Sequence, residues 1–404
     1  MFQFDLKTYT EKFIDMNEYN RLMSLKDSYI AKLNSCEMTG WMDEISPELV
    51  NDIKETANYV KNNFDCLVVV GIGGSFLGSY AFHNMFKSYF NDKSYEVIYA
   101  GYTLSSKYLD ELLKYLEHKN FCLNVISKSG TTMETSITYK VIKDLLKRKY
   151  GEEIRKHIIV TTDEVKGILR EEVNEAHYKS FTIPNNIGGR YSFITPAHLL
   201  PLALNYNLTE IIDGYYDGKR LIDYAYNYAV VRKLLFDKGK YVENFCVYEE
   251  NLLSFTEWLK QLFGETEGKN GKGIFPTSNI HTRDLHSLGQ FIQEGNKIIF
   301  ETFIKINNSK NYINYNNKEL HEINNIVEDS VMRAHYSGNV PCIEITIDNL
   351  TPEVVSSLIY FFQLSASFSG LLFGVDPFNQ PGVEVYKKEV KDALNRQWKR
   401  DILL

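Results

Sequence analysis

Short β-rich runs alternate with segments of helical periodicity along most of this chain, and this alternation restricts the fold more than any other feature. In a first series the β-rich runs occupy residues 66–70, 95–100, 121–126, 157–161 and 181–183. A second series has runs at 244–248, 297–304 and 342–347, again with helical segments between them. Strands that alternate with helices form parallel sheets whose two faces are covered by helices. The sequence therefore predicts an α/β fold of two doubly wound lobes.

The length of 404 residues is sufficient for two such lobes. No stretch rich in Pro, Gly and Ser marks their junction near residues 205–235, which predicts close packing without a tether. The Asn- and Lys-rich stretch 307–325 is expected to be a surface insertion. The expected parts are a helical N-terminal segment at 1–60, a first lobe at 61–205, a second lobe at 206–380 and a C-terminal helix at 381–404.

Charge and cysteine usage restrict the partners and the compartment. The net charge of −7, without a basic patch, argues against nucleic acid or an anionic membrane as the main partner. The five cysteines are scattered and show neither a CxxC pair nor a zinc-binding spacing. Reduced thiols in a cytoplasmic protein are therefore expected, with no metal site. The first five residues do not resemble the start of a secretory signal.

One stretch is long enough to cross a membrane. Residues 354–375 contain no charged side chain, and about 20 apolar residues can span a bilayer. The stretch nevertheless carries Gln363 and five serines, and a helix-start signal precedes it at 351–353. A buried core helix is the prediction.

A single turn carries four hydroxyls, one ammonium group and one glycine in six consecutive residues. It reads Ser127-Lys128-Ser129-Gly130-Thr131-Thr132 and lies between an apolar strand and a helix expected to begin near Thr131. The free N–H groups of a helix start, the helix dipole, the hydroxyls and Lys128 favour a compact anion, best of all phosphate. The competing interpretation is a Ser/Thr-rich helix cap with no ligand. The concentration of hydroxyls favours the phosphate site.

Two glycine-rich turns follow other predicted strands. Residues 71–78 fail the dinucleotide fingerprint, because Phe76 replaces its third glycine, and they also fail the phosphate-loop pattern. This turn either admits a sugar or phosphate, with Ser75 as a donor, or is an ordinary strand-to-helix turn. Residues 188–192 hold Arg190 behind two glycines, where it either stabilises a developing oxyanion or is a solvated surface residue.

Acid–base groups occur in the second series. A helix with a buried stripe over 252–262 is expected to end at Gly264, and Gln261 lies on the same side as Glu265. The helix dipole disfavours a carboxylate at this end, which suits a base, whereas the alternative is a solvated acidic loop. His286 suits proton transfer at neutral pH, although a lone histidine more often has a structural role. Lys387 lies either at the edge of a pocket or at the start of a charged C-terminal helix.

Taken together, these segments resemble the glucose-6-phosphate isomerase family from about residue 60 to the last helix. The runs at 188–192 and 380–387 resemble the two signature segments of the family, and residues 264–269 resemble its catalytic glutamate segment in the shorter bacterial form. The resemblance implies two flavodoxin-like sugar-isomerase lobes and a cytoplasmic homodimer in which His286 reaches the active site of the neighbouring subunit. It also implies a sugar phosphate substrate and neither a metal nor a redox cofactor.

The resemblance further implies individual roles. Glu265 would move the proton between C1 and C2, Arg190 would stabilise the enediolate, and His286 with Lys387 would assist ring opening. Substrate binding would fall to Gly74, Ser75, Ser127, Lys128, Ser129, Thr132, Thr135, Gln261 and Gln380. Ser127, Ser129, Thr132 and Thr135 of this set would hold the 6-phosphate.

The chain departs from the family pattern at two positions. Asn379 replaces the usual Asp, and His198 replaces a small residue at the end of the arginine signature. Both flank the expected catalytic groups, so they affect local geometry more than activity. Interconversion of glucose 6-phosphate and fructose 6-phosphate is the function that the resemblance implies. The alternatives are a sugar-phosphate-sensing protein without catalysis and an isomerase that also accepts mannose 6-phosphate.

Overall fold

The computed structural model describes residues 2–308 and 313–397. The chain forms two compact units, each with its own five-stranded sheet. The first unit comprises Glu37–Tyr80, Ser88–Leu208 and the chain from Phe378 onward. The second unit comprises the chain up to Cys36, Ala81–Lys87 and Thr209–Pro377. Each unit therefore contains one of the two series of strands that the sequence predicts.

The sheet of the first unit is wholly parallel. Its spatial order is β3-β2-β4-β5-β6, so the earliest strand has neighbours on both sides and the winding direction reverses at β2. A reversal of this kind defines the flavodoxin-like, doubly wound topology and places ligands beside the reversal point. The strands are β2 (Cys66–Val70), β3 (Glu96–Ala100), β4 (Phe121–Ile126), β5 (Ile158–Thr162) and β6 (Lys179–Thr182).

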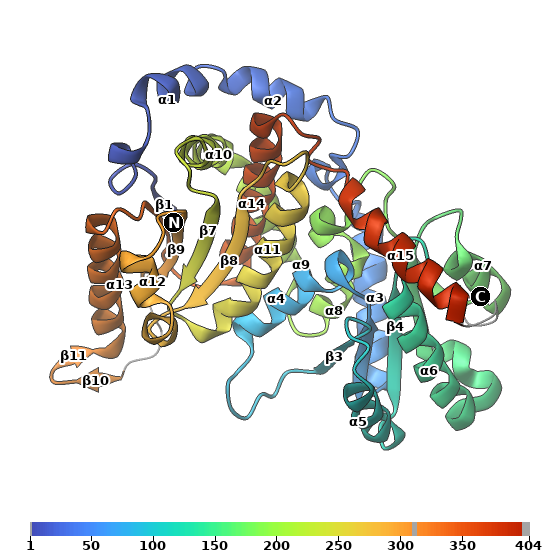
Figure 1. Cartoon of the computed structure of the whole chain (residues 1–404). Helices are drawn as coiled ribbons and strands as arrows, with labels where there is room; N and C mark the ends of the chain where they lie inside the picture. Colours follow the sequence, from blue (N-terminus) through green and yellow to red (C-terminus); the bar gives the residue numbers. More distant parts are fainter. Residues whose placement is uncertain (1, 309–312, 398–404) are drawn as a thin grey trace. The chain divides into compact units, whose positions relative to one another are not determined.

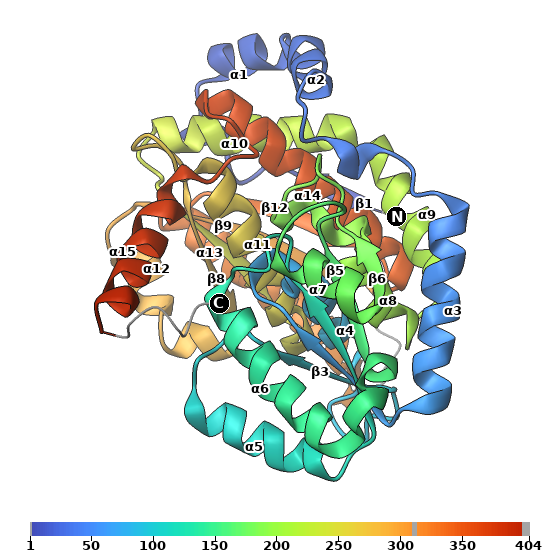
Figure 2. The same ribbon diagram turned by 90° about the vertical axis from the view of Figure 1, so that its right-hand side faces the viewer.

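Helices cover both faces of this sheet (Figure 2). Apolar side chains from α5, α6 and α7 join those of the strands in one core on one face, while α3 and α8 contact each other on the opposite face. Helix α4 runs from the first unit into the second. The helices are α3 (Pro47–Asn63), α4 (Leu77–Phe86), α5 (Ser106–Glu117), α6 (Met133–Tyr150), α7 (Ile168–Ala176), α8 (Pro196–Ala203) and α15 (Pro381–Gln397).

The sheet of the second unit has the order β1-β12-β9-β7-β8. Its four later strands are parallel and repeat the reversal of winding, at β7, whereas β1 pairs antiparallel with β12 at the edge. The strands are β1 (Phe2–Asp5), β7 (Val242–Val247), β8 (Phe275–Ile280), β9 (Ile299–Ile306) and β12 (Cys342–Ile347), and a separate hairpin joins β10 (Asn314–Tyr315) to β11 (Lys318–Glu319).

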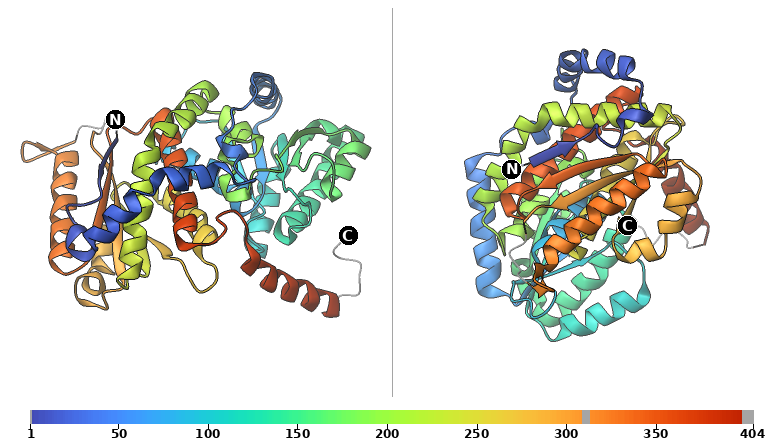
Figure 3. Two further views of the ribbon diagram at one scale, coloured as in Figure 1. Left: turned by 90° about the horizontal axis from the view of Figure 1, so that it is seen from above. Right: turned by 90° about the vertical axis from the view of Figure 1, so that its left-hand side faces the viewer.

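Two layers of helices enclose this second sheet (Figures 1 and 3). One face carries α12 and α13, and the other carries α10, α11 and α14. The helices are α1 (Met16–Met23), α2 (Lys26–Asn34), α9 (Leu208–Asp217), α10 (Ile222–Asp237), α11 (Leu253–Glu267), α12 (Gly289–Glu294), α13 (Leu320–Ser337) and α14 (Pro352–Phe373). Short 3₁₀ turns complete the chain: η1 (Glu11–Phe13), η2 (Gly40–Met42), η3 (Gly73–Ser75), η4 (Gly151–His157), η5 (Gly189–Ile194), η6 (Gly218–Leu221), η7 (Glu250–Leu252) and η8 (Arg283–His286).

The long apolar helix α14 is a core helix, as predicted. Among the described residues it is the one helix long and apolar enough to cross a membrane, and its side chains are almost all buried within the unit. Thr351 caps its start by accepting the Val354 N–H at 3.4 Å, Pro352 occupies its first position, and Gly374 ends it at φ +70°. Some of the polar groups inside it are hydrogen-bonded: Tyr215 of α9 donates to Gln363 Oε1 at 2.6 Å, and Ser365 Oγ donates to the Phe361 carbonyl at 2.8 Å.

Two features differ from the sequence-based expectation, and a third agrees with it in part. Strand β8 was not predicted, because it contains Pro276 and polar residues; its place at the sheet edge explains why proline is tolerated. The N-terminal residues are not one helical segment, because Phe2–Asp5 form a strand and Pro47–Asn63 belong to the other unit. Within the stretch 307–325, residues 309–312 lie outside the described part, and the rest contains the exposed hairpin and the first turn of α13.

Candidate active site

The hydroxyl-rich turn connects β4 to α6 and holds itself in shape. Ser127 Oγ accepts the Gly130 N–H at 3.1 Å, and Ser129 Oγ accepts the Thr131 N–H at 3.2 Å. Gly130 adopts φ +71°, a backbone conformation that residues other than glycine rarely adopt. Thr132 occupies the N-cap position, but its side chain makes no capping bond to α6. The helix-cap interpretation therefore does not account for these hydroxyls.

Neighbouring segments brace this turn, which we call the cradle (residues 127–135). Thr162 Oγ1 donates to the Ser127 carbonyl at 2.8 Å, and Gly167 approaches so closely that an added Cβ would lie 3.0 Å from the Ser129 carbonyl oxygen. Lys128 Nζ donates to two backbone carbonyls at 3.2 Å, those of Pro184 and Asn185, and burial lowers the pKa of its ammonium group. In this arrangement Lys128 anchors the cradle to the 184–185 loop.

Inside the cradle, Thr135 adds a buried hydroxyl. Its side chain is 2% exposed, and its Oγ1 has no hydrogen-bond partner among the described residues. A buried hydroxyl without a partner costs about 1–3 kcal/mol unless a ligand or water satisfies it. Thr135, in the first turn of α6, therefore indicates that the start of this helix receives a further polar group.

The glycine turn after β2 opens beside the cradle. Strands β2 and β4 are neighbours at the point where the winding reverses, so the turns after them share one edge of the sheet. An added Cβ on Gly71 would lie 3.4 Å from the Ile126 carbonyl oxygen, at the end of β4. Gly74 and Ser75, in η3, thus lie on the same edge as the cradle.

The arginine loop packs directly on this glycine turn. An added Cβ on Gly74 would lie 2.2 Å from the Gly189 carbonyl carbon, which leaves no room for any side chain. Ser192 Oγ donates to the Gly74 carbonyl at 3.0 Å. The close contact explains why Gly74 must be glycine, and it ties Arg190 to the sheet edge that carries the cradle.

Arg190 is 1% exposed, so the interpretation as a solvated surface residue is wrong. Its Nη2 donates to the backbone carbonyl of Asn379 at 3.2 Å, and its guanidinium lies 5.5 Å from the centre of the Tyr191 ring. The contact with Asn379 uses main-chain oxygen and does not depend on Asn or Asp at this position. The departure from the family pattern at 379 is therefore compatible with the placement of Arg190.

His198 holds the glycine turn from within the core. Its Nδ1 accepts the Ser79 N–H at 3.0 Å, so Nε2 carries the proton and donates to the Gly74 carbonyl at 2.8 Å. Its ring also packs 3.1 Å from the position of an added Cβ on Gly78. His198, noted in the sequence only as a departure, is thus a positioning residue for the turn that contacts the Arg190 loop.

We expect His198 to make the protein less stable in acid. Burial lowers its pKa to about 4, below the value of about 6.5 in an unfolded chain. The unfolded state therefore binds more protons between these values, and stability falls as the pH drops through this window, by up to about 3 kcal/mol. The drop in thermal midpoint between pH 7 and pH 5 should be smaller in His198→Gln than in the wild type. Equal drops would contradict this assignment.

Gln380 directly precedes α15, and Lys387 lies on that helix with an exposed side chain. Lys387 Nζ pairs with Glu384 Oε1 at 3.0 Å, one helical turn earlier. Both interpretations of the segment 380–387 are thus compatible with its structure, since it begins a charged helix and presents an ammonium group to solvent.

The second unit carries the acid–base candidates. Helix α11 continues to Glu267 and is capped by Gly268, so the prediction that it ends at Gly264 is wrong. A Cβ added to Gly264 would make only ordinary contact with Pro276, at 3.6 Å. The predicted pairing on one side of the helix is present, because Gln261 Nε2 donates to Glu265 Oε1 at 3.1 Å. Glu265 lies in the last turn of α11 and is partly exposed.

A second glutamate of the same segment is structural. Glu267 is fully buried and forms an ion pair with Arg232, and its Oε2 accepts the Ile274 N–H at 3.3 Å. Glu267 is thus committed to the core, whereas Glu265 of the same segment is partly exposed. The structure also separates the two histidines nearby, since His286 is exposed at the end of η8 whereas His281 is buried.

Comparison of the sequence with known proteins shows to which family the chain belongs. The sequence model of the family described as phosphoglucose isomerase matches residues 48–328 and 317–401. The chain belongs to the phosphoglucose isomerase family. Glucose-6-phosphate isomerase of Staphylococcus saprophyticus is 41% identical over 388 residues, covering 89% of this chain and 88% of the relative. The Clostridium tetani enzyme of the same name is 39% identical over 393 residues, with 89% and 88% covered.

Solved structures agree with the fold of the phosphoglucose isomerase family. A protein of Thermus thermophilus, described as hypothetical, superposes with a TM-score of 0.85 at 25% identity and covers 98% of this chain and 100% of its own. A glucose-6-phosphate isomerase from Chlamydia trachomatis gives a TM-score of 0.81 at 17% identity, with 97% and 92% covered. The predicted α/β class with parallel sheets and flanking helices is confirmed.

Proposed function

We propose that this chain interconverts glucose 6-phosphate and fructose 6-phosphate through a cis-enediolate, the step that serves glycolysis and gluconeogenesis. The observation that carries the proposal is the uncapped start of α6, where the cradle hydroxyls, the free helix end and the buried Thr135 meet. A helix start of this kind binds a phosphate group. Membership of the phosphoglucose isomerase family supports our proposal that this phosphate is the 6-phosphate of a hexose.

The proposed roles divide between the two units. In the first unit Ser127, Ser129, Thr132 and Thr135 bind the 6-phosphate, with Gly74, Ser75, Lys128 and Gln380 around the sugar. In the second unit Glu265 is the base that moves the proton between C1 and C2, and Gln261, which hydrogen-bonds to it, positions the sugar. A positioned base of this kind contributes roughly 10²- to 10⁴-fold to the rate.

The remaining roles concern charge and ring opening. The enediolate carries developing negative charge on oxygen, which a preorganised guanidinium stabilises at little reorganisation cost. Arg190 suits this role because its contacts with Asn379 and Tyr191 fix its place. His286 and Lys387 are proposed to assist ring opening. The exposure of His286 agrees with our proposal that it completes the active site of a neighbouring subunit in a cytoplasmic homodimer.

The alternatives differ in a simple assay. Purified protein is supplied with glucose 6-phosphate in one series and mannose 6-phosphate in another, and fructose 6-phosphate formation is followed with a coupling enzyme. Turnover of glucose 6-phosphate alone is expected. Binding without turnover would instead identify a sugar-phosphate sensor, and comparable turnover of both sugars would identify a broader isomerase. The presence of Glu265, Arg190, His286 and Lys387 together favours catalysis.

Loss of cradle hydroxyls should weaken substrate binding more than catalysis. A hydrogen bond to a charged group contributes about 1.5–3 kcal/mol, so Ser129→Ala and Thr132→Ala should each raise KM about 10- to 100-fold. The value of kcat should change much less, because the phosphate is bound equally in the ground and transition states. Ser105→Ala is the matched control, since Ser105 caps the start of α5 in the same unit. A fall in kcat at unchanged KM would contradict the cradle assignment.

A further inference from the structure

Three side chains of metal-binding type meet inside the second unit. Cys246 lies on β7, Glu301 lies on β9, and His281 directly follows β8. One ligand atom from each lies within 4.8 Å of the other two, and all three side chains are buried. Strand β7 runs between β8 and β9 in the sheet, and Cys246 pairs in register with Asn279 of β8. The three groups therefore converge from three adjacent parallel strands.

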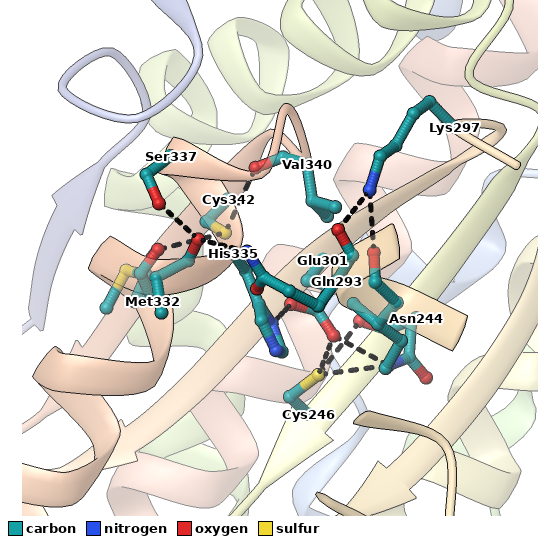
Figure 4. A network of polar contacts seen from close by, with 12 residues as sticks. Asn244, Cys246, Gln293, Lys297, Glu301, Met332, His335, Ser337, Val340 and Cys342 are labelled. Carbon is teal, nitrogen blue, oxygen red and sulfur yellow. Dashed lines mark hydrogen bonds and ion pairs between the residues drawn. The ribbon is translucent and has the colours of Figure 1, made fainter. Parts of the chain in front are cut away.

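A network of hydrogen bonds orients the carboxylate of this cluster (Figure 4). Glu301 Oε1 accepts from Cys246 Sγ at 3.3 Å and from Asn244 Nδ2 at 3.0 Å. Its Oε2 pairs with His335 Nδ1, on α13, at 2.5 Å. One carboxylate oxygen thus faces the thiol, and the other is fixed by an imidazole. Outer partners of this kind fix the ligands of metal sites and raise metal affinity.

The cluster also holds buried polar atoms that lack partners. His281 is 3% exposed, yet neither of its ring nitrogens has a hydrogen-bond partner among the described residues. Within the described part of the chain the same holds for Asn244 Oδ1 and for the hydroxyl of Tyr248, whose ring lies 5.3 Å from that of His281. Each such atom costs about 1–3 kcal/mol when it stays unsatisfied. These atoms belong to one ligand of the cluster and to two residues that contact its members, because Asn244 bonds to Glu301 and Tyr248 packs on His281. A further polar species therefore belongs in the cluster.

We propose that Cys246, His281 and Glu301 bind a zinc ion. Zinc bonds of about 2.0–2.3 Å in a tetrahedron place ligand atoms about 3.3–3.6 Å apart. Cys246 Sγ and Glu301 Oε1 already have this spacing, at 3.3 Å, and the His281 nitrogen lies within 4.8 Å of the other two ligand atoms. Thiolate, imidazole and carboxylate are all zinc ligands, whereas magnesium and calcium take oxygen. The thiolate and the carboxylate together balance the charge of Zn²⁺, which suits a buried site. A water takes the fourth position.

Sequence reasoning predicted no metal site because it relied on zinc-binding spacing along the chain. The three ligands are 35 and 20 residues apart and belong to separate strands, so only the sheet brings them together. An ion here joins β7, β8 and β9, and its role is structural. Zinc binding then contributes to the stability of the second unit, because the unfolded chain lacks a preformed site.

The test uses the full chain, purified, stripped with a chelator and then titrated with Zn²⁺ and Co²⁺. One ion per chain is expected, with a rise in thermal midpoint and, for Co²⁺, the charge-transfer absorption of a thiolate ligand. Cys246→Ser and His281→Gln should each weaken binding at least about 100-fold, and His335→Gln about 10- to 100-fold. The matched control is Cys342→Ser, because Cys342 is a buried thiol of the same core cluster outside the ligand set.

The proposal is overturned by either of two results. In the first, the wild-type protein with Co²⁺ shows no thiolate charge-transfer absorption, and Zn²⁺ does not raise its thermal midpoint. This result would mean that ordered water fills the cluster. Wild-type affinity in Cys246→Ser or His281→Gln would place the ion elsewhere. The cobalt spectrum requires no substitution, so it decides the question even if a variant fails to fold.

Discussion

Glu265→Gln is expected to lower kcat by roughly 10²- to 10⁴-fold while leaving KM and the thermal midpoint nearly unchanged. The amide keeps the size of the side chain and can still hydrogen-bond to Gln261, which lies 3.1 Å from the carboxylate, but it cannot accept a proton from C1 or C2. The measurement is the steady-state rate of fructose 6-phosphate formation, with the thermal midpoint recorded on the same preparation.

Two neighbours on α11 make this result specific. Glu257→Gln is the matched control, because Glu257 lies on the same helix and pairs with Lys260 near the surface; its rate should equal that of the wild type. Glu267→Gln should instead lower stability, since Glu267 is paired with Arg232 in the core. Full activity in Glu265→Gln would show that another group is the base.

The largest loss of stability is expected from Arg232→Met. Arg232 is fully buried and pairs with two buried carboxylates, those of Glu243 and Glu267, while its Nη1 also donates to Ser369 Oγ at 2.7 Å. Burial by itself lowers the pKa of the guanidinium. The attraction of Glu243 and Glu267 outweighs this effect and raises the pKa above its usual value. Without the arginine the carboxylates remain buried and uncompensated, which costs about 3–5 kcal/mol. Urea denaturation measures the change in the free energy of unfolding.

A variant without any charge in this network tests whether the loss of stability comes from the uncompensated carboxylates. In the triple variant Arg232→Met, Glu243→Gln, Glu267→Gln no charge of this network remains buried, so part of the loss should be recovered. Arg220→Met removes an exposed pair with Asp217 and should leave the urea midpoint nearly unchanged. If the single variant Arg232→Met were as stable as the wild type, the buried ion network would not stabilise the second unit.

Most strands could be predicted because their side chains are apolar on both faces. Strands β2 and β4 have the predicted bounds, since Cys66–Val70 is wholly apolar and Phe121–Ile126 is apolar except for Asn124. Strand β8 could not be predicted, because an edge strand tolerates Pro276 and polar residues. Strand β1 (Phe2–Asp5) is four residues long, contains Gln3 and Asp5, and was not predicted. Its place in the sheet comes from pairing with β12.

The candidate site was predictable where its residues are close in sequence. The cradle and the pair of Gln261 and Glu265 depend on spacings of a few residues, which one turn or one helix fixes. The contact between Gly74 and Gly189, the anchoring role of His198 and the cluster around Cys246 join segments far apart in the chain. Only the folded sheets create these contacts, so local patterns could not predict them.

The most direct test of the proposed isomerase follows the hydrogen at C2 of the substrate. Glucose 6-phosphate labelled with deuterium at C2 is converted by the wild-type protein in ordinary water, and the label in fructose 6-phosphate is measured by mass spectrometry. If a base such as Glu265 carries the proton from C2 to C1, part of the label exchanges with solvent and the rest appears at C1. Complete retention of deuterium at C1, or no conversion at all, would contradict the proton-transfer mechanism through an enediolate.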